Sequence, residues 1–174
     1  MKARGMALAV LTLGFAAAAF AAEPKHETPA GPPNPGFERL KALIGSWEGT
    51  GEDGKPVAIS YSLISGGSAL EEKLGPADEP SMVTMYHPDG TTVLMTHYCA
   101  AQNQPRLRAK AASPDARTLE FTFVDCSNLS SKDAGHMHHL VLSFEDPDHF
   151  SQEWTWKENA KERKTLFHFS RRKA

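Results

Sequence analysis

Cysteines, basic runs and long hydrophobic segments are all scarce in this chain. Of its 174 residues only two are cysteines, Cys99 and Cys126, so at most one disulfide can form within the chain. Lysine and arginine together number 19 against 21 acidic residues, a formal net charge of −2, and no basic run is present. A mildly acidic chain of this kind is not expected to bind nucleic acid.

The one long hydrophobic run lies at the N-terminus. Lys2 and Arg4 precede an apolar stretch over residues 6–20, and Ala19-Phe20-Ala21 fits an A-x-A cleavage site. This order predicts a secretory signal peptide over residues 1–21. The stretch is shorter than the roughly 20 residues that a membrane-spanning helix needs. We therefore expect a periplasmic or secreted protein with no stable membrane anchor.

Proline dominates the segment that follows the predicted signal peptide. Five prolines lie between residues 23 and 35. Proline lacks a backbone N–H and breaks helices and paired strands, so the pattern predicts a disordered, proline-rich tether over residues 22–35. The remaining residues, 36–174, suit one domain with one core, and we expect a monomer.

The domain opens with a short amphipathic helix and then changes to a period of two. Apolar residues at helical spacing over 36–44 end at Gly45, a typical helix stop. Beyond it, Leu119, Phe121 and Phe123 alternate with polar neighbours, and similar segments recur between turn signals. We predict ten strands, centred near residues 48, 60, 71, 84, 95, 108, 121, 140, 153 and 167. The predicted fold is all-β, a ten-stranded up-and-down antiparallel β-barrel with the helix closing one end, and a two-sheet sandwich is the alternative.

Gly45-Ser46-Trp47, placed between the helix and the first strand, resembles the Gly-x-Trp motif of lipocalins and the wider calycin group. The resemblance implies that the tryptophan packs beneath the helix, beside an arginine of the last strand, here Arg171 or Arg172. The strand count is closer to that of fatty-acid-binding and nitrobindin-type barrels. The runs at residues 96–99 and 103–106 also resemble secreted bacterial lipocalin-like proteins of uncharacterised function.

Alternate connections of a meander fall at opposite ends of a barrel, so the longer loops should share the end opposite the helix. Long loops over a rigid barrel mouth are where ligand contacts usually lie. We therefore predict an exported, lipocalin-like barrel that binds a small, partly apolar molecule at this end. Residues expected to form the site are Tyr61, His97, Tyr98, Arg106, Phe121, Phe123, His136 and Trp154.

The face to which the arginines point decides whether the ligand could be anionic. Arg106 and Arg108 share one face of their strand, and Leu107 and Ala109 share the other. If the arginines point inward, they offer an anchor for a carboxylate or another anion. If they point outward, they are ordinary solvated side chains. One carboxylate of the pair Glu71-Glu72 must also face inward and would need a partner such as one of these arginines.

Metal or haem binding is the competing hypothesis. His97 with Cys99, and His136 with His138, have the i, i+2 spacing that puts both side chains of a pair on one face of a strand. Together they offer the nitrogen and sulfur ligands that zinc prefers, and haem could bind through one of the histidines. Alternatively, these are polar residues at the barrel end that bind no metal. We favour this interpretation and expect no cofactor, with zinc and haem as the alternatives.

The two cysteines complete the set of candidates. A disulfide between Cys99 and Cys126 would join the ends of two strands at the same end of the barrel, although strict alternation points Cys126 outward unless a bulge intervenes. Cysteine catalysis by Cys99, with His97 or His136 as the base, lacks any diagnostic nucleophile turn. We therefore favour a binding protein over an enzyme, and a structural module without a cavity remains the third alternative.

Overall fold

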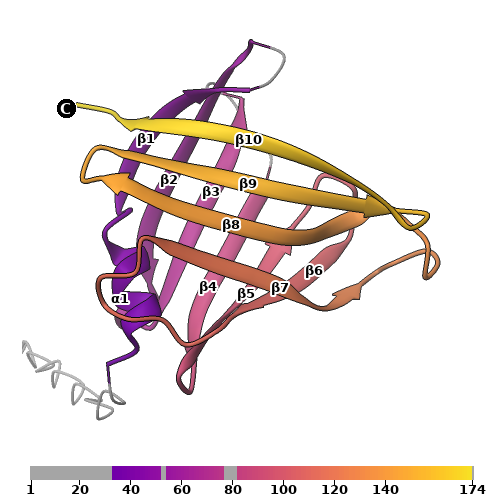
Figure 1. Ribbon diagram of the computed structural model, residues 1–174, viewed down its shortest axis with the longest axis horizontal. Helices are drawn as coiled ribbons and strands as arrows, with labels where there is room; N and C mark the ends of the chain where they lie inside the picture. The colour runs from indigo at the N-terminus through magenta and orange to yellow at the C-terminus, as the bar shows by residue number, and fades with distance from the viewer. Residues whose placement is uncertain (1–32, 52–53, 77–81, 174) are drawn as a thin grey trace, which may run out of the picture. The chain divides into compact units, whose positions relative to one another are not determined.

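Ten strands close into one antiparallel barrel in the computed structural model, which describes residues 33–51, 54–76 and 82–173 (Figure 1). Each strand pairs with its neighbour in sequence, and β10 returns to pair with β1. This confirms the predicted up-and-down barrel and excludes the sandwich, and every predicted strand centre falls inside a strand. The strands are β1 Gly45–Thr50, β2 Pro56–Ile64, β3 Ala69–Pro76, β4 Met82–Asp89, β5 Thr92–Tyr98, β6 Gln104–Ala109, β7 Thr118–Ser127, β8 His136–Asp146, β9 His149–Glu158 and β10 Lys161–Arg171, with a short 3-10 turn at Ser65–Gly67.

Alternation of apolar and polar residues puts one face of each strand inside the barrel. On β7, Leu119 and Phe121 are buried, whereas Glu120 and Thr122, which alternate with them, are exposed. Burial of the apolar face is the main term that stabilises such a fold. The largest fully buried side chains are Trp47, Tyr86, Phe121, Phe150 and Phe169.

The helix α1, Pro35–Lys41, is anchored at its N-terminus by Asn34. The Asn34 side chain accepts a hydrogen bond from the Phe37 N–H at 2.9 Å and donates to the carbonyls of Gly90 and Thr92 at 3.0 and 2.8 Å. Pro35 occupies the first turn, where its missing N–H costs nothing. The predicted tether therefore extends too far, because Asn34 and Pro35 belong to the barrel domain. The predicted signal peptide and the tether up to residue 32 lie outside the described residues.

Trp47 and Arg171 join the helix to the barrel. Trp47 is 1% exposed, and its indole N–H donates to the Leu43 carbonyl at 2.7 Å. The Arg171 guanidinium lies 4.0 Å from the centre of the indole ring and donates to the carbonyls of Ala42, Ile44 and Pro147 at 2.9 to 3.1 Å. Arg171 is thus the arginine partner that the lipocalin resemblance implied, and it satisfies the carbonyls left free where the helix ends.

We call the opposite end of the barrel, formed by the connections 99–103, 128–135 and 159–160, the open end. Figure 1 shows the β7–β8 and β9–β10 connections far from α1, as the meander argument predicted.

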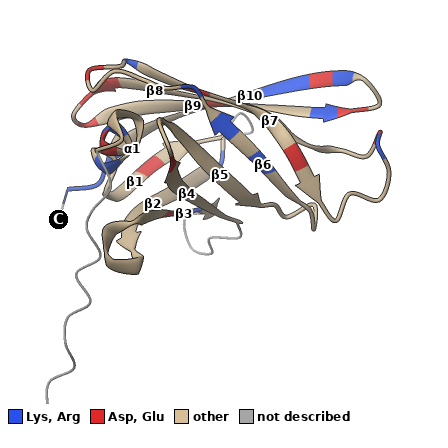
Figure 2. Ribbon diagram, turned by 90° about the horizontal axis from the view of Figure 1, so that it is seen from below, with Lys and Arg blue, Asp and Glu red and all other residues tan. Residues whose placement is uncertain are grey.

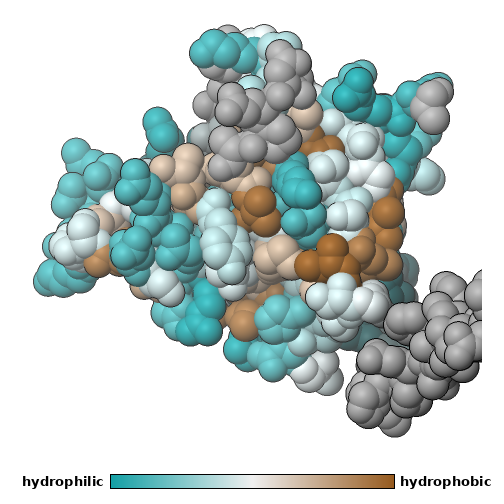
Figure 3. Space-filling view, turned by 180° about the vertical axis from the view of Figure 1, so that it is seen from behind, coloured by the Kyte–Doolittle hydropathy of each residue, from teal (hydrophilic) through white to brown (hydrophobic). Residues whose placement is uncertain are grey.

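Along the strands and their connections, acidic and basic residues are interspersed rather than gathered in one place (Figure 2). The face seen in Figure 3 likewise mixes hydrophobic and hydrophilic side chains. Among the described residues, no helix is long and apolar enough to cross a membrane.

Replacing Arg171 should open the helix end of the barrel. We expect Arg171→Ala to lower the free energy of unfolding by about 2–4 kcal/mol, because it removes charge-assisted hydrogen bonds and the contact with Trp47. Denaturation in urea measures this. Arg172→Ala is the matched control, because Arg172 only approaches Glu48 at 3.8 Å on the exposed surface and should change stability by less than about 0.5 kcal/mol. Equal effects of the two substitutions would contradict the role given to Arg171.

Candidate functional site

A buried carboxylate occupies the middle of the barrel. Glu72 is fully buried, and four donors point at its two oxygens. Its Oε2 accepts from the Tyr61 hydroxyl at 2.7 Å, the Tyr86 hydroxyl at 2.8 Å and the Gln152 amide at 3.0 Å, and its Oε1 accepts from the Thr84 hydroxyl at 3.0 Å. Strand register explains the cluster, because Tyr61, Glu72 and Thr84 are direct cross-strand partners on β2, β3 and β4.

His97 extends this network toward the open end. It pairs across β4 and β5 with Thr84, and its Nδ1 lies 2.9 Å from the Thr84 Oγ1. The hydroxyl has a single hydrogen. If that hydrogen goes to Glu72, His97 must donate from Nδ1 to the hydroxyl oxygen, and its Nε2 is left with a lone pair. This Nε2 is buried and has no hydrogen-bond partner, and the imidazole ring lies 4.8 Å from the Trp154 ring.

Burial sets the protonation of these groups. Burial raises the pKa of Glu72, while its four hydrogen bonds, those from Tyr61 and Tyr86 first, act in the opposite direction. Burial lowers the pKa of His97 to about 4, so the imidazole is neutral at pH 7. A neutral imidazole with one nitrogen held and the other free can accept a proton or a hydrogen bond, or bind a metal.

A second cluster of rings lies nearer the open end. Phe123 lies 4.8 Å from both His136 and His138, measured between ring centres. The Nδ1 of His136 lies 2.9 Å from the Ala134 carbonyl, and its Nε2 lies 3.2 Å from the Nδ1 of His138. A carbonyl only accepts, so a neutral His136 donates from Nδ1 and accepts at Nε2 from His138. Burial lowers the pKa of His138.

A bulge on β7 reverses the orientation expected for Cys126. Register shifts so that Leu107 pairs with Phe123, Arg106 with Asp125, and Val124 is left over. Cys126 then pairs with the buried Pro105 and shares its inward face. Cys99 and Cys126 are nevertheless separate free thiols, so the predicted disulfide is not formed in this structure. Burial raises the pKa of the Cys126 thiol.

Two predicted contacts, Arg106 and Tyr98, face outward, and so does Arg108. Arg106 makes a two-pronged salt bridge with Asp125, and Arg108 pairs with Asp89 at 2.9 Å, all on the exposed surface. Tyr98 is 50% exposed, because it is next to the inward-facing His97 on β5. Leu107 and Ala109 are the buried residues of β6, so the inward arginine anchor is wrong and the solvated alternative holds. The partners of Glu72 are consequently tyrosines and neutral polar groups rather than an arginine.

The remaining candidates divide between the core and the open end. Tyr61, Phe121 and Trp154 are almost completely buried, whereas Phe123 is half-buried beside the histidines. The described residues contain no group of three or more histidines, cysteines or acids arranged to hold a metal ion. His97, Cys99, His136 and His138, the residues of the alternative metal hypothesis, are not brought together as such a group.

Sequence reasoning missed most of the residues around Glu72. Thr84, Tyr86 and Gln152 lie on inward positions of predicted strands, so alternation could have placed them inside. Their convergence on one carboxylate depends on strand register, which cannot be derived from the amino-acid sequence.

Comparisons with known proteins add little to this geometry. No family model matches the chain, and no curated protein matches it. Among solved structures, a redesigned beta barrel named b11L5F_LGL is 14% identical, with 79% of this chain and 96% of that chain covered and a TM-score of 0.34. The structure of EF1p2_mFAP2b bound to DFHBI is also 14% identical, with 78% and 98% covered and a TM-score of 0.33. Similarity at this level has no bearing on function.

His97 should make stability depend on pH in a defined direction. Its pKa in the folded state, about 4, lies below the ordinary value of 6.5, so only the unfolded chain gains a proton as the pH falls from 6.5 toward 4. Between pH 7 and pH 4 this should remove about 3 kcal/mol of stability, and above pH 7 the effect vanishes. Urea denaturation at both pH values, for the natural protein and for His97→Phe, isolates the contribution of this residue. Identical pH dependence in the two proteins would contradict the assignment.

Proposed function

We propose that this protein is an exported barrel that binds a small, largely apolar molecule at its open end, with His97 as the polar contact. One observation carries the proposal: the Nε2 of a neutral, buried histidine has no hydrogen-bond partner. A buried polar atom without a partner costs about 1–3 kcal/mol. A ligand that donates an O–H or N–H to this nitrogen would recover that free energy.

Partly buried apolar side chains near the open end support an apolar ligand. Val57, Met82 and Met137 stand at the starts of β2, β4 and β8, which are the ends of those strands nearest the open end, and they are only partly buried. Methionine side chains adapt readily to new neighbours. Because His97 itself is 1% exposed, we propose that a ligand reaches Nε2 by displacing such side chains.

The charges near the site favour a neutral ligand with a donor group. Glu72 is the acid nearest to His97 in the network, and Arg106 and Arg108 lie on the outer surface beside their own acids. An anion would therefore meet no inward arginine on β6 and would approach a buried carboxylate. An alcohol or a phenol with an apolar body fits these constraints.

Two matched probes test the role of His97. We expect 1-naphthol to bind and 1-methoxynaphthalene, which has the same rings but no donor, to bind roughly tenfold more weakly, as expected for one hydrogen bond to a buried acceptor. Equilibrium dialysis measures both affinities. His97→Phe keeps a ring beside Trp154 but removes the acceptor, so it should bind both probes equally.

The control is Arg106→Ala, which should bind the probes as the natural protein does, because its side chain lies outside the barrel. Equal affinity of the natural protein for both probes, or unchanged discrimination in His97→Phe, would contradict a role for Nε2. Mass spectrometry of the protein purified from its native source would identify a co-purified ligand.

Metal binding is a second candidate, favoured by the geometry of His136 and His138. Their facing nitrogens lie 3.2 Å apart, close to the about 3.3–3.4 Å between two ligands of a tetrahedral zinc with Zn–N of about 2.0–2.1 Å. The hydrogen bond from His136 to the Ala134 carbonyl is the support that metal-binding histidines usually have. Haem fits less well, because His97 is enclosed by the core and lies against Trp154.

Zinc titration distinguishes the metal candidate from the apolar-ligand candidate. At pH 7.5 we expect Zn²⁺ to bind with a measurable heat, and His138→Gln to weaken binding at least tenfold, since second-shell and ligand losses typically cost 10–100-fold. His139→Gln is the matched control, because His139 pairs with Glu120 at 2.9 Å instead. The same affinity in both variants would place the metal elsewhere, and a double replacement of Cys99 and Cys126 by serine would then test the thiols.

A further inference from the structure

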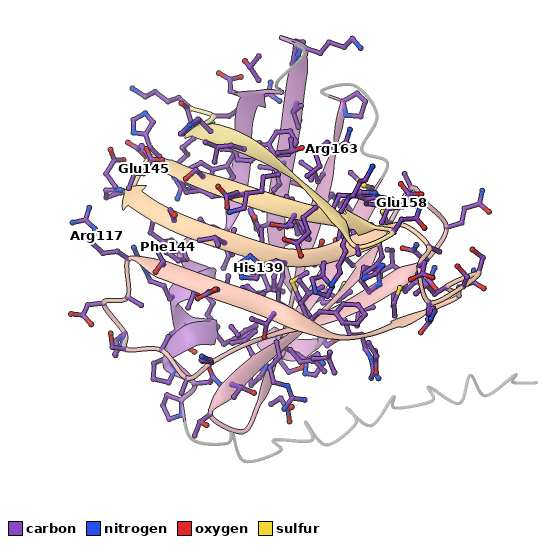
Figure 4. All side chains as sticks on the ribbon, turned by 45° about the vertical axis from the view of Figure 1, so that its right-hand side comes forward. Arg117, His139, Phe144, Glu145, Glu158 and Arg163 are labelled. Atoms are coloured by element: carbon purple, nitrogen blue, oxygen red, sulfur yellow. The ribbon has the colours of Figure 1, made fainter. Side chains whose placement is uncertain are left out.

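A polar groove of approximately 570 Å³ opens at the same end of the barrel, outside the His97 network. Its walls come from three segments: the turn that contains Gln102 and Asn103, the connection 128–135, and the end of β9 with Asn159 directly after it. Figure 4 marks this end of β9 by the label of Glu158. The groove belongs to neither of the candidate sites above.

Three hydrogen bonds tie the walls to one another. The Asn128 side chain donates to the Gln102 carbonyl at 2.7 Å, and the Asn103 side chain donates to the Gly135 carbonyl at 2.9 Å. The Asn159 N–H donates to the Asp133 carbonyl at 3.0 Å. A groove held in this way is already formed before a ligand arrives, which lowers the entropic cost of binding.

Asn103 supplies an acceptor whose partner is missing. Its side-chain amide nitrogen must face the Gly135 carbonyl, which fixes the orientation of the amide. The amide oxygen, Oδ1, is then buried without any hydrogen-bond partner, and the residue is 4% exposed. Because Oδ1 is covered, a ligand hydroxyl can donate to it only if the Asn103 side chain shifts, and such a hydrogen bond would recover the free energy of the missing partner.

Trp156 gives the groove a flat apolar surface. Gly135 packs directly on the indole, because a Cβ at this position would lie 2.0 Å from the ring atom Cζ2. Only glycine therefore lets the connection 128–135 lie against the ring. The indole is half-buried and lines the groove beside the polar groups.

The chemistry of the lining selects the ligand class. Amide side chains, serine hydroxyls and the carboxylates of Asp133 and Glu158 line the groove, and none of the described residues that line it is lysine or arginine. Such a surface disfavours anions, and it matches a molecule whose many hydroxyls both donate and accept. An aromatic ring among these groups offers a face to the C–H side of a sugar.

We infer that this groove binds a neutral saccharide, with Trp156 beneath the sugar ring and Asn103 and Asp133 hydrogen-bonded to its hydroxyls. A second groove of approximately 540 Å³ also has Trp156, Glu158 and Asn159 in its lining, but its other walls are Lys161, Glu162 and Arg163. The neutral lining that fits a saccharide therefore belongs to the first groove alone.

A panel of sugars tests the inference by NMR of the tryptophan indole N–H signals. The panel contains glucose, galactose, mannose, N-acetylglucosamine, maltotriose and the β-1,4-linked trimer of N-acetylglucosamine, and spermidine serves as a cationic comparison. We expect at least one sugar to shift the indole signal of Trp156 while the signal of Trp47, at the helix end, stays fixed. Asp133→Ala, an exposed position that should fold normally, is expected to weaken this sugar at least fivefold, and Trp156→Ala should abolish its binding.

The controls separate this site from the others. Asp89→Ala removes an acid at the helix end and should leave sugar binding unchanged. His97→Phe should also leave it unchanged, because its loss of discrimination between 1-naphthol and 1-methoxynaphthalene concerns the proposed function alone. The inference is overturned if no sugar shifts the Trp156 signal, if spermidine shifts it and the sugars do not, or if Asp133→Ala binds the sugar as tightly as the natural protein.

Discussion

The interior of this barrel contains a buried carboxylate, Glu72, whose hydrogen-bond partners are all neutral side chains. Burying an ionised group is costly unless hydrogen bonds replace its water, and Glu72 obtains four of them from Tyr61, Tyr86, Thr84 and Gln152. These donors come from β2, β4 and β9, so one side chain joins strands from distant parts of the chain. Losing a single donor would leave the others aimed at a poorly compensated charge. The network therefore restrains the register of the strands around it.

In the part of the chain that the structure describes, the two ends of the barrel differ because α1 covers only one of them. At the helix end, the Arg171 side chain donates hydrogen bonds to the carbonyls of Ala42, Ile44 and Pro147 and covers the Trp47 ring. These carbonyls therefore have their hydrogen-bond partners within the fold. At the open end the groups are less completely satisfied, with unpaired atoms on His97 and Asn103 and half-buried methionines. A ligand is therefore expected at the open end, where hydrogen bonds to these unpaired buried atoms would add to the free energy of binding.

The sequence predicted what depends on local period and missed what depends on register. Alternation located all ten strands, and a three-residue motif placed Trp47 beneath the helix beside Arg171. The bulge at Val124 carries no sequence signal, so the inward turn of Cys126 and the outward pairing of Arg106 with Asp125 could not be derived with certainty. The convergence of donors on Glu72 was likewise hidden, because it joins residues up to 80 positions apart.

The shared hydroxyl of Thr84 links the protonation of Glu72 to the kind of ligand that His97 can accept. With Glu72 ionised, the hydroxyl hydrogen points to the carboxylate and Nε2 of His97 is an acceptor. If Glu72 gains a proton on Oε1, it can donate to Thr84, which then donates to Nδ1 and moves the imidazole proton to Nε2. Burial raises the pKa of Glu72, so this exchange is less costly than for an exposed carboxylate. Through these three buried side chains, one proton on Glu72 would convert the Nε2 of His97, the proposed ligand contact, from a hydrogen-bond acceptor to a donor.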